Sequence, residues 1–189
     1  FKDAGCWAIV FGAESGVQKN LNTIRKGITL EQIQNAVKWA KEVGLKVSTP
    51  FIFGIPGETY EEGLQTIEFA VRLDPDMANF HAITPFPGTY LYDNIGIYGT
   101  MSENLTDFTY QGAAFIPFTM TRDEILNLRQ LAFRRFYLRP SFILRKLFEL
   151  RSLNDLMVVV MGMKSLFWLW IKKDIFHRNA KGHRYLFII

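Results

Sequence analysis

Short apolar runs alternate with amphipathic stretches along the first half of the chain. Residues 7–11, 47–53 and 77–84 each predict a β-strand, and each run leads into a loop rich in glycine or proline. The first run holds no polar residue, which predicts a strand buried on both faces. Pro50 lies inside the second run and predicts a bulge or another irregularity there, because proline cannot donate a ladder hydrogen bond.

Two amphipathic helices are predicted between these strands. The first begins after Thr29, which forms the signature of a capping box with Gln32, and it ends at Gly44. The second begins after Thr59 and ends at the Asp-Pro-Asp of residues 74–76. Strand and helix therefore alternate as βαβαβ, which predicts an α/β fold with parallel strands and right-handed crossovers.

Three special loops follow the predicted strands: Gly-Ala-Glu-Ser-Gly at 12–16, Gly-Ile-Pro-Gly-Glu at 54–58 and Pro-Phe-Pro-Gly-Thr at 85–89. Parallel α/β sheets bind ligands beyond the carboxyl ends of their strands, so we expect the site at this edge. Glu14 offers a carboxylate for a diol or an amine; a helix-capping role is the alternative. Glu58 is interpreted as a residue of the first helical turn rather than a ligand. His81 is interpreted as a core or rim residue, with a ligand or proton-transfer role as the alternative.

Composition narrows the class of protein. Hydrophobic residues make up 49% of the chain, which excludes wholesale disorder, and the single cysteine excludes a disulfide scaffold or a site of several thiolates built from this chain alone. Residues 1–94 carry 8 Lys and Arg against 11 Asp and Glu, a net of −3, whereas residues 95–189 carry 14 against 7, a net of +7. The basic half is interpreted as a solvated helical face, with phosphate groups, an anionic membrane or an acidic partner as alternatives.

The second half predicts a linker at residues 96–121 and a basic, apolar helical tail at 122–189, with a helix break at Pro140. Residues 156–171 form a mostly apolar stretch that Lys164 interrupts, and they are fewer than the roughly 20 residues that a membrane span needs. Three interpretations stay open for this segment: packing against another part of the protein, attachment to a membrane surface, or a span. No nucleic-acid motif occurs, so no nucleic-acid partner is expected.

Three strings carry a family resemblance. Phe-Gly-Ala-Glu-Ser-Gly at 11–16, Gly-Leu-Lys-Val through Phe-Ile-Phe-Gly-Ile-Pro-Gly-Glu-Thr at 44–59, and Pro-Phe-Pro-Gly-Thr-Tyr-Leu-Tyr at 85–92 resemble, in order and spacing, the fourth to sixth strands of radical S-adenosylmethionine (SAM) enzymes. Residues 136–145 are similar to the C-terminal region of the cobalamin-binding subgroup that includes the anaerobic magnesium-protoporphyrin cyclase type. The resemblance implies that residues 1–95 form the C-terminal half of a partial (β/α)6 radical SAM barrel, followed by the linker and the tail.

The same resemblance implies cofactors and site residues. The cofactors are SAM, a [4Fe-4S] cluster and, in the subgroup, cobalamin. Glu14 and Ser15 match positions that face the ribose or methionine portion of SAM. Gly12 joins them because a glycine lets a ligand approach the backbone. The remaining predicted residues match the strand that packs on adenine and the loop near adenine or substrate: Ile52, Phe53, Gly54, Pro85 and Phe86.

One departure from the family pattern limits what the chain can do. The Cys-x3-Cys-x2-Cys cluster motif is absent, and one cysteine cannot supply three thiolates. We therefore expect the C-terminal portion of a longer cytoplasmic enzyme, peripheral to the inner membrane face and inactive without its N-terminal half. Its expected chemistry is methyl transfer, cyclisation or a related reaction on a small or lipid-like molecule, and no catalytic residue is assigned. The alternatives are a non-catalytic interaction module with a membrane-surface tail and an unrelated nucleotide-binding α/β enzyme.

Overall fold

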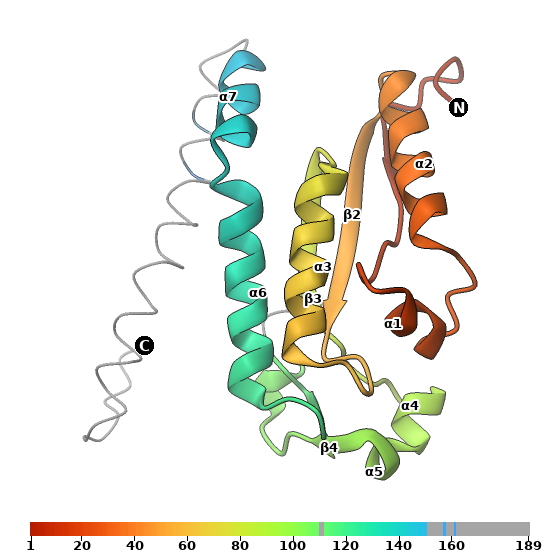
Figure 1. Ribbon diagram of the computed structural model, residues 1–189, viewed down its shortest axis with the longest axis vertical. Helices are drawn as coiled ribbons and strands as arrows, with labels where there is room; N and C mark the ends of the chain where they lie inside the picture. The colour runs from red at the N-terminus through yellow and green to blue at the C-terminus, as the bar shows by residue number, and fades with distance from the viewer. Residues whose placement is uncertain (110–111, 151–156, 158–160, 162–189) are drawn as a thin grey trace. The chain divides into compact units, whose positions relative to one another are not determined.

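The computed structural model describes residues 1–109, 112–150, 157 and 161 (Figure 1). The chain divides into two compact units, residues 1–137 and 138–189. The first unit holds the sheet and all the loops predicted to form the site. The two units are described separately below.

Three parallel strands form the centre of the first unit. They are β1 (Ala8–Val10), β2 (Lys46–Phe53) and β3 (Met77–Ala82), in the order β1-β2-β3, so that the longest strand lies in the middle. Helices α1 (Gln18–Thr23) and α2 (Leu30–Glu42) connect β1 to β2, and α3 (Tyr60–Leu73) connects β2 to β3. The predicted βαβαβ order and the parallel pairing are confirmed.

Both long helices begin at the residues that the sequence predicts. Thr29 accepts a hydrogen bond from the backbone of Gln32 at α2, while the Gln32 side chain accepts one from the backbone of Thr29. Thr59 and Glu62 form the same reciprocal pair at α3. Each box satisfies two backbone N–H groups that a helix start leaves without a partner. The residue at which each of these helices begins is therefore determined by nearby side chains.

One face of the sheet is covered by helices. Successive side chains of a strand point to opposite faces, and on this face every described position of β2 and β3 is buried. Phe51 stacks on Phe80 with ring centroids 5.6 Å apart, and Phe133 of α6 (Arg122–Tyr137) meets Phe80 edge-on at 5.3 Å. Helices α3 and α6 lie side by side on this face (Figure 1).

Helix α6 also closes the outer edge of β3. The Tyr137 hydroxyl donates to the carbonyl of Ala78 at 2.7 Å and accepts from the N–H of the same residue at 3.1 Å. Arg129 Nε donates to the carbonyl of Phe80 at 3.1 Å. These contacts occupy backbone groups that an edge strand would otherwise expose. Side chains of α6 thus form hydrogen bonds with β3 that a neighbouring strand would usually form.

The opposite face of the sheet is open. Among the described residues of this unit, Val10 of β1 stays 67% exposed and Met77 of β3 stays 52% exposed. The prediction that the first strand is buried on both faces is therefore wrong for this chain. The apolar run of residues 7–11 has a covering layer on one side only, among residues that the structure describes.

The segment expected to be a linker carries regular structure. It holds two short helices, two antiparallel strands and a 3-10 turn: α4 (Tyr90–Asp93), α5 (Ile95–Tyr98), β4 (Gly99–Met101), η1 (Leu105–Asp107) and β5 (Phe115–Pro117). Arg122 donates through Nη2 and Nε to the two carboxylate oxygens of Asp107, which holds the pKa of Asp107 below its usual range. The compact unit thus extends through α6 to residue 137, beyond the expected boundary at residue 95.

In the second unit, α7 (Pro140–Phe148) begins with Pro140 in its first turn, as the predicted helix break at this proline requires. The apolar segment 156–171 lies, except for residues 157 and 161, outside the described residues. Within the described ranges, no helix combines the length and the apolar character needed to cross a membrane.

We predict that Gly16→Ala destabilises the protein. A Cβ at position 16 would lie 2.8 Å from the Cα of Thr66 in α3, and backbone on both sides leaves little room to adjust. The expected loss is about 1–3 kcal/mol in the free energy of unfolding, measured by urea denaturation. Gly96→Ala is the control, because a Cβ there meets open space. Equal unfolding midpoints for both variants would contradict the packing described for Gly16.

Candidate functional site

The three loops that follow β1, β2 and β3 lie at the same end of the sheet (Figure 1). Parallel pairing requires this, because the carboxyl ends of all three strands then share one edge. Segment 89–98, with α4 and α5, lies at the same end. The edge where the sequence predicts a site is therefore assembled from four stretches of chain.

A one-residue bulge interrupts the pairing of β1 with β2. Val10 lies opposite Ser48, so that a regular ladder would bring residue 13 opposite Phe51. Glu14 takes that place instead, donating to the carbonyl of Pro50 at 3.0 Å and accepting from the N–H of Ile52 at 2.7 Å. Pro50 has no N–H to offer on the side that faces β1. The irregularity predicted from Pro50 is confirmed, and the extra residue lies in the neighbouring strand.

Glu14 occupies the left-handed region with φ of +61°. This conformation costs a residue with a side chain about 1–2 kcal/mol and breaks the alternation of side chains along a strand. Its partner Phe51 faces the helices, yet Glu14 lines a cavity together with Ile52 and His81 of the open face. Helix α1 starts after Val17 without an acidic residue in its first turn, so the helix-capping alternative for Glu14 is wrong.

Lys26 holds the Glu14 carboxylate by an ion pair of 2.8 Å. The Glu14 side chain is only 15% exposed, so the pair is partly shielded from water. Gly12 lies beneath it, and a Cβ at that position would lie 2.7 Å from Lys26 Nζ. A glycine at position 12 therefore serves the ion pair by leaving space for both charged groups.

The cavity beside Glu14 has a volume of about 640 Å³. Pro50 and Ile52 of β2, His81 of β3 and Phe86 of the third loop form much of its wall. A carboxylate can accept hydrogen bonds from a diol or an amine, and the apolar wall suits a flat, weakly polar group. The cavity thus combines an acceptor for a polar group with a surface for a ring.

The structure brings some of the predicted site residues together and separates others. Glu14, Ile52 and Phe86 line the cavity, Gly12 supports Glu14, and Pro85 directly precedes Phe86 in the buried start of the loop. The side chains of Ser15 and Phe53 are fully buried within the protein, on the side of the helices. Any contact of these two residues with a ligand would have to come from their backbone.

Glu58 is a site residue that the sequence interpretation placed wrongly. It precedes the cap residue Thr59 and so lies outside the first helical turn. Its fully buried carboxylate accepts hydrogen bonds from the N–H groups of Gly54 at 2.7 Å and Ile55 at 3.2 Å. Burial raises the pKa of Glu58 to about 7, against the opposing effect of these two hydrogen bonds. The signal in the sequence was an acid closing a Gly-x-Pro-Gly turn.

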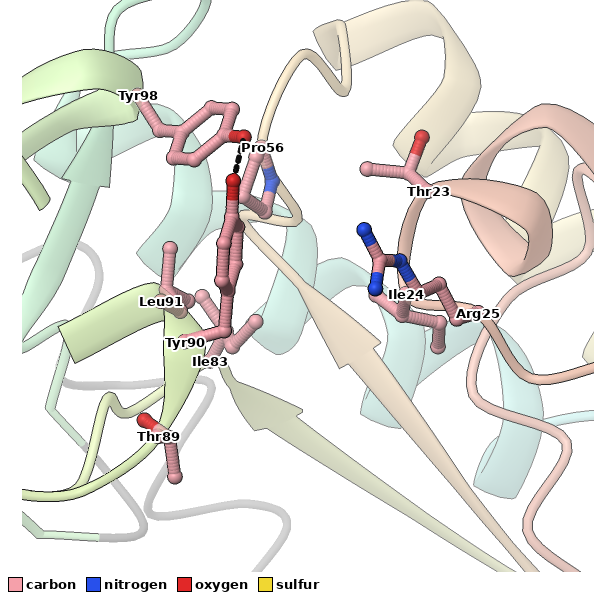
Figure 2. Close-up of a pocket in the computed structure, with 9 residues that line it drawn as sticks. All are labelled: Thr23, Ile24, Arg25, Pro56, Ile83, Thr89, Tyr90, Leu91 and Tyr98. Carbon is pink, nitrogen blue, oxygen red and sulfur yellow. Dashed lines mark hydrogen bonds between the residues drawn. The ribbon is translucent and has the colours of Figure 1, made fainter. Parts of the chain in front are cut away.

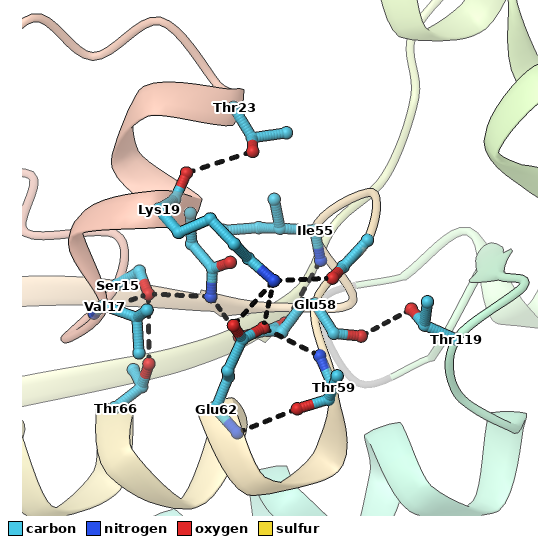
Figure 3. Close-up of polar contacts among 12 residues, drawn as sticks. Ser15, Val17, Lys19, Thr23, Ile55, Glu58, Thr59, Glu62, Thr66 and Thr119 are labelled. Carbon is cyan, nitrogen blue, oxygen red and sulfur yellow. Dashed lines mark hydrogen bonds and ion pairs between the residues drawn. The ribbon is translucent and has the colours of Figure 1, made fainter.

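A buried polar network joins the first loop to the second. Asn20 Nδ2 donates to Glu58 Oε1 at 3.2 Å and to Ser15 Oγ at 3.3 Å. The Ser15 hydroxyl pairs with Thr66 Oγ1 of α3 at 3.1 Å (Figure 3). At the rim, Lys19 bridges the Gly57 carbonyl and the Glu62 carboxylate. These contacts hold the loop that contains Glu14 in a fixed position relative to the turn at residues 54–58.

A second hollow of about 360 Å³ lies at the same edge (Figure 2). Arg25 enters it from the turn after α1, and Tyr90 and Tyr98 enter it from α4 and α5. Ile83, which follows β3, lines both this hollow and the cavity of Glu14. The two spaces therefore share a wall.

The sequence lacks the cysteines that would hold an iron–sulfur cluster. Cys6 is the single cysteine of the sequence, and its thiol donates to the Ala8 carbonyl at 3.2 Å. In the part of the chain that the structure describes, no three His, Cys, Asp or Glu side chains gather as metal ligands would. An iron–sulfur cluster needs more thiolates than the chain contains, so the residues present do not fit one.

Comparison with known proteins finds one matching family and several similar enzymes. Residues 1–70 match the family described as the radical SAM superfamily. The chain is 39% identical over 153 residues to an uncharacterised methyltransferase of Pyrococcus horikoshii, covering 78% of this chain and 32% of the relative. It is 29% identical over 148 residues to the anaerobic magnesium-protoporphyrin IX monomethyl ester cyclase of Rubrivivax gelatinosus, covering 76% and 26%.

A third relative matches along most of the chain. The bacteriochlorophyllide d C-8(2)-methyltransferase of Chlorobaculum tepidum is 26% identical over 184 residues, which cover 95% of this chain and 40% of the relative. The chain therefore spans less than half the length of each of these relatives. The similarity to the cyclase type confirms the subgroup resemblance found in the sequence.

We predict that Glu58 makes stability fall as the pH rises from about 4.5 to about 7. The folded protein binds this proton more tightly than the unfolded chain, so its contribution is complete below pH 4.5 and is lost as the pH passes the folded pKa. The loss amounts to at most about 3 kcal/mol. Urea denaturation at several pH values should show this slope in the wild type and a flatter one in Glu58→Gln. Glu61→Gln, which removes an exposed carboxyl of the same helix, serves as control, and identical slopes for all three proteins would contradict the assignment.

Proposed function

Because this chain belongs to the radical SAM superfamily, we propose that it is part of a larger radical SAM enzyme and supplies strands of its SAM-binding barrel. The observation that carries the proposal is the bulge at Glu14. It places a carboxylate in a cavity at the carboxyl edge of a parallel sheet, next to apolar residues of β2 and the third loop. In this proposal β1 to β3 are the fourth to sixth strands of a partial (β/α)6 barrel.

The open face of the sheet supports the barrel arrangement. Among the described residues, helices cover the face that holds Phe51 and Phe80, as they do on the outside of a barrel of alternating strands and helices. Val10 and Met77 are exposed on the other face, which would be the barrel interior. The remaining strands would then come from the part of the enzyme that this chain lacks.

The residues of the cavity suit the parts of SAM. The Glu14 carboxylate would accept hydrogen bonds from the ribose diol or the amino group, while Lys26 keeps that carboxylate in place. Ile52 and Phe86 would form the apolar wall for adenine. Bound SAM supplies radical or methyl-transfer chemistry in this family. The role of the chain's own residues is to bind and orient it and to exclude water.

The cluster and the reaction belong to the rest of the enzyme in this proposal. The chain has too few thiolates for a [4Fe-4S] cluster, so it would be inactive without its N-terminal half. The relatives named as methyltransferases and cyclases support methyl transfer or ring formation. Cobalamin as a further cofactor of the whole enzyme rests on the resemblance of residues 136–145 to the cobalamin-binding subgroup. The same names leave the non-catalytic interaction module without support.

Partners and location follow from the same proposal. The main partner is the N-terminal half of the same enzyme, and the substrate is a small or lipid-like molecule. The basic second half of the sequence supports contact with the anionic inner face of a membrane by an otherwise cytoplasmic enzyme. No nucleic acid takes part.

We predict that Glu14→Gln in the full-length enzyme weakens SAM binding about tenfold, because a neutral amide replaces the charged acceptor. Equilibrium dialysis with labelled SAM measures the Kd. Glu31→Gln is the matched control, since it removes one carboxyl from the start of α2, away from the cavity. If both variants bind SAM as tightly as the wild type while remaining folded, Glu14 has no part in binding the cofactor.

We predict that Cys6→Ser leaves the iron and sulfide content of the full-length enzyme unchanged. The Cys6 thiol already donates to a backbone carbonyl, and a serine hydroxyl can make the same contact. Iron and acid-labile sulfide are assayed in anaerobically purified protein. A large loss of iron in this variant, with normal folding by circular dichroism, would mean that Cys6 is a cluster ligand after all.

A further inference from the structure

We propose that the hollow of Arg25, Tyr90 and Tyr98 binds the substrate and that it selects an organic anion with a flat apolar body. This inference rests on the proposed function, because it assigns the neighbouring cavity to SAM. The carboxylate or phosphate of the substrate would lie at Arg25, and its body would lie against the tyrosines and the apolar wall (Figure 2).

The charge of Arg25 is the first support for this proposal. Its guanidinium lies 5.6 Å from the centroid of the Tyr90 ring, across the hollow. Among the described residues, Arg25 forms no ion pair with an acid, and no acid lines the hollow. A guanidinium over an aromatic face in an otherwise weakly polar space suits a carboxylate or phosphate, which it can bind through two parallel N–H groups.

The backbone at Arg25 is the second support. This residue has φ of +54°, in the left-handed region that glycine occupies without strain, and it follows the last turn of α1. Gly27, two residues later, has φ of +70° and carries the usual residue for such a position. The left-handed backbone at position 25 is less favourable for arginine than for glycine, and in this conformation the arginine side chain lines the hollow.

The place of the hollow is the third support. It has a volume of about 360 Å³, within the range of small-molecule sites, and its wall of Ile24, Pro56, Ile83 and Leu91 is apolar. Ile83 also lines the cavity of Glu14. A molecule in the hollow would thus lie beside a molecule in the cavity, as a substrate must lie beside the group that attacks it.

The experiment uses the full-length protein and two probes of the same shape. These are 2-naphthoate, a flat aromatic anion, and 2-naphthylmethanol, its neutral counterpart. Binding is followed by the fluorescence of the probe. We expect saturable binding of 2-naphthoate, about tenfold tighter than binding of 2-naphthylmethanol, because only the anion can pair with Arg25.

Variants locate the binding. Arg25→Gln should bring 2-naphthoate to the affinity of 2-naphthylmethanol, whereas Arg72→Gln, which removes an equal charge from the exposed end of α3, should change neither. Tyr90→Leu should weaken the binding of both probes, because the hollow loses an aromatic ring against which they pack. Arg25→Gly should be as stable as the wild type or more stable, and it should bind 2-naphthoate weakly.

Three results would overturn the proposal. They are equal affinity of the wild type for both probes, unchanged 2-naphthoate affinity in Arg25→Gln, and no saturable 2-naphthoate binding up to about 1 mM. SAM binding to the wild-type protein separates this inference from the proposed function. If the wild type binds 2-naphthoate as described but fails to bind SAM, the hollow is an anion site and the proposed function fails.

Discussion

Pro50 removes one hydrogen-bond donor from the middle strand of the sheet, and the geometry of the site depends on that loss. The N–H groups of Lys46 and Ile52 reach β1 and the Glu14 loop, but position 50, on the same side, can only accept. The pairing of the first strand with β2 is interrupted opposite Pro50. Between the paired positions on either side, the first strand contains one residue more than β2 does. The left-handed backbone of Glu14 keeps its carboxylate on the open face, although the added residue brings Glu14 opposite Phe51, whose side chain faces the helices.

The position of Glu14 is held from two sides. Lys26 pairs with its carboxylate above Gly12, and the buried network of Ser15, Asn20 and Glu58 fixes its loop to the turn that follows β2. Burying a carboxyl such as Glu58 is costly, and its raised pKa reflects that cost. The hydrogen bonds that Glu58 accepts from Gly54 and Ile55 offset part of it and make the second loop rigid. A candidate binding edge that is built from loops thereby gains a fixed geometry.

Much of the fold could be predicted because local signals and the global pattern agree. The capping boxes at Thr29 and Thr59 and the apolar runs of β2 and β3 each specify their element within a few residues. The exposure of β1 could not be predicted, since an apolar run does not say whether a second layer covers it. The packing of α6 was missed for a similar reason, because the contacts of Arg129 and Tyr137 with β3 join residues about 50 or more positions apart.

The site was partly predictable. The strings around Glu14, Gly54 and Phe86 indicated the carboxyl edge of the sheet, and Glu14, Ile52 and Phe86 lie around one cavity at that edge. Ser15 and Phe53 were predicted from the family strings alone, and in the structure both side chains lie on the side of the sheet that the helices cover. The roles of Glu58 and Arg25 depend on turns whose side-chain directions no spacing rule gives. The assignment of the cavity to SAM comes from the family and from the chemistry of its walls.

The most direct test of this account is a crystal structure of the full-length enzyme with bound SAM. The account predicts that the ribose diol or the amino group lies within hydrogen-bonding distance of the Glu14 carboxylate and that adenine lies against Ile52 and Phe86. It also predicts that further strands of the same barrel cover the face of Val10 and Met77. SAM bound away from this edge, with Glu14 paired to Lys26 alone, would contradict the central claim.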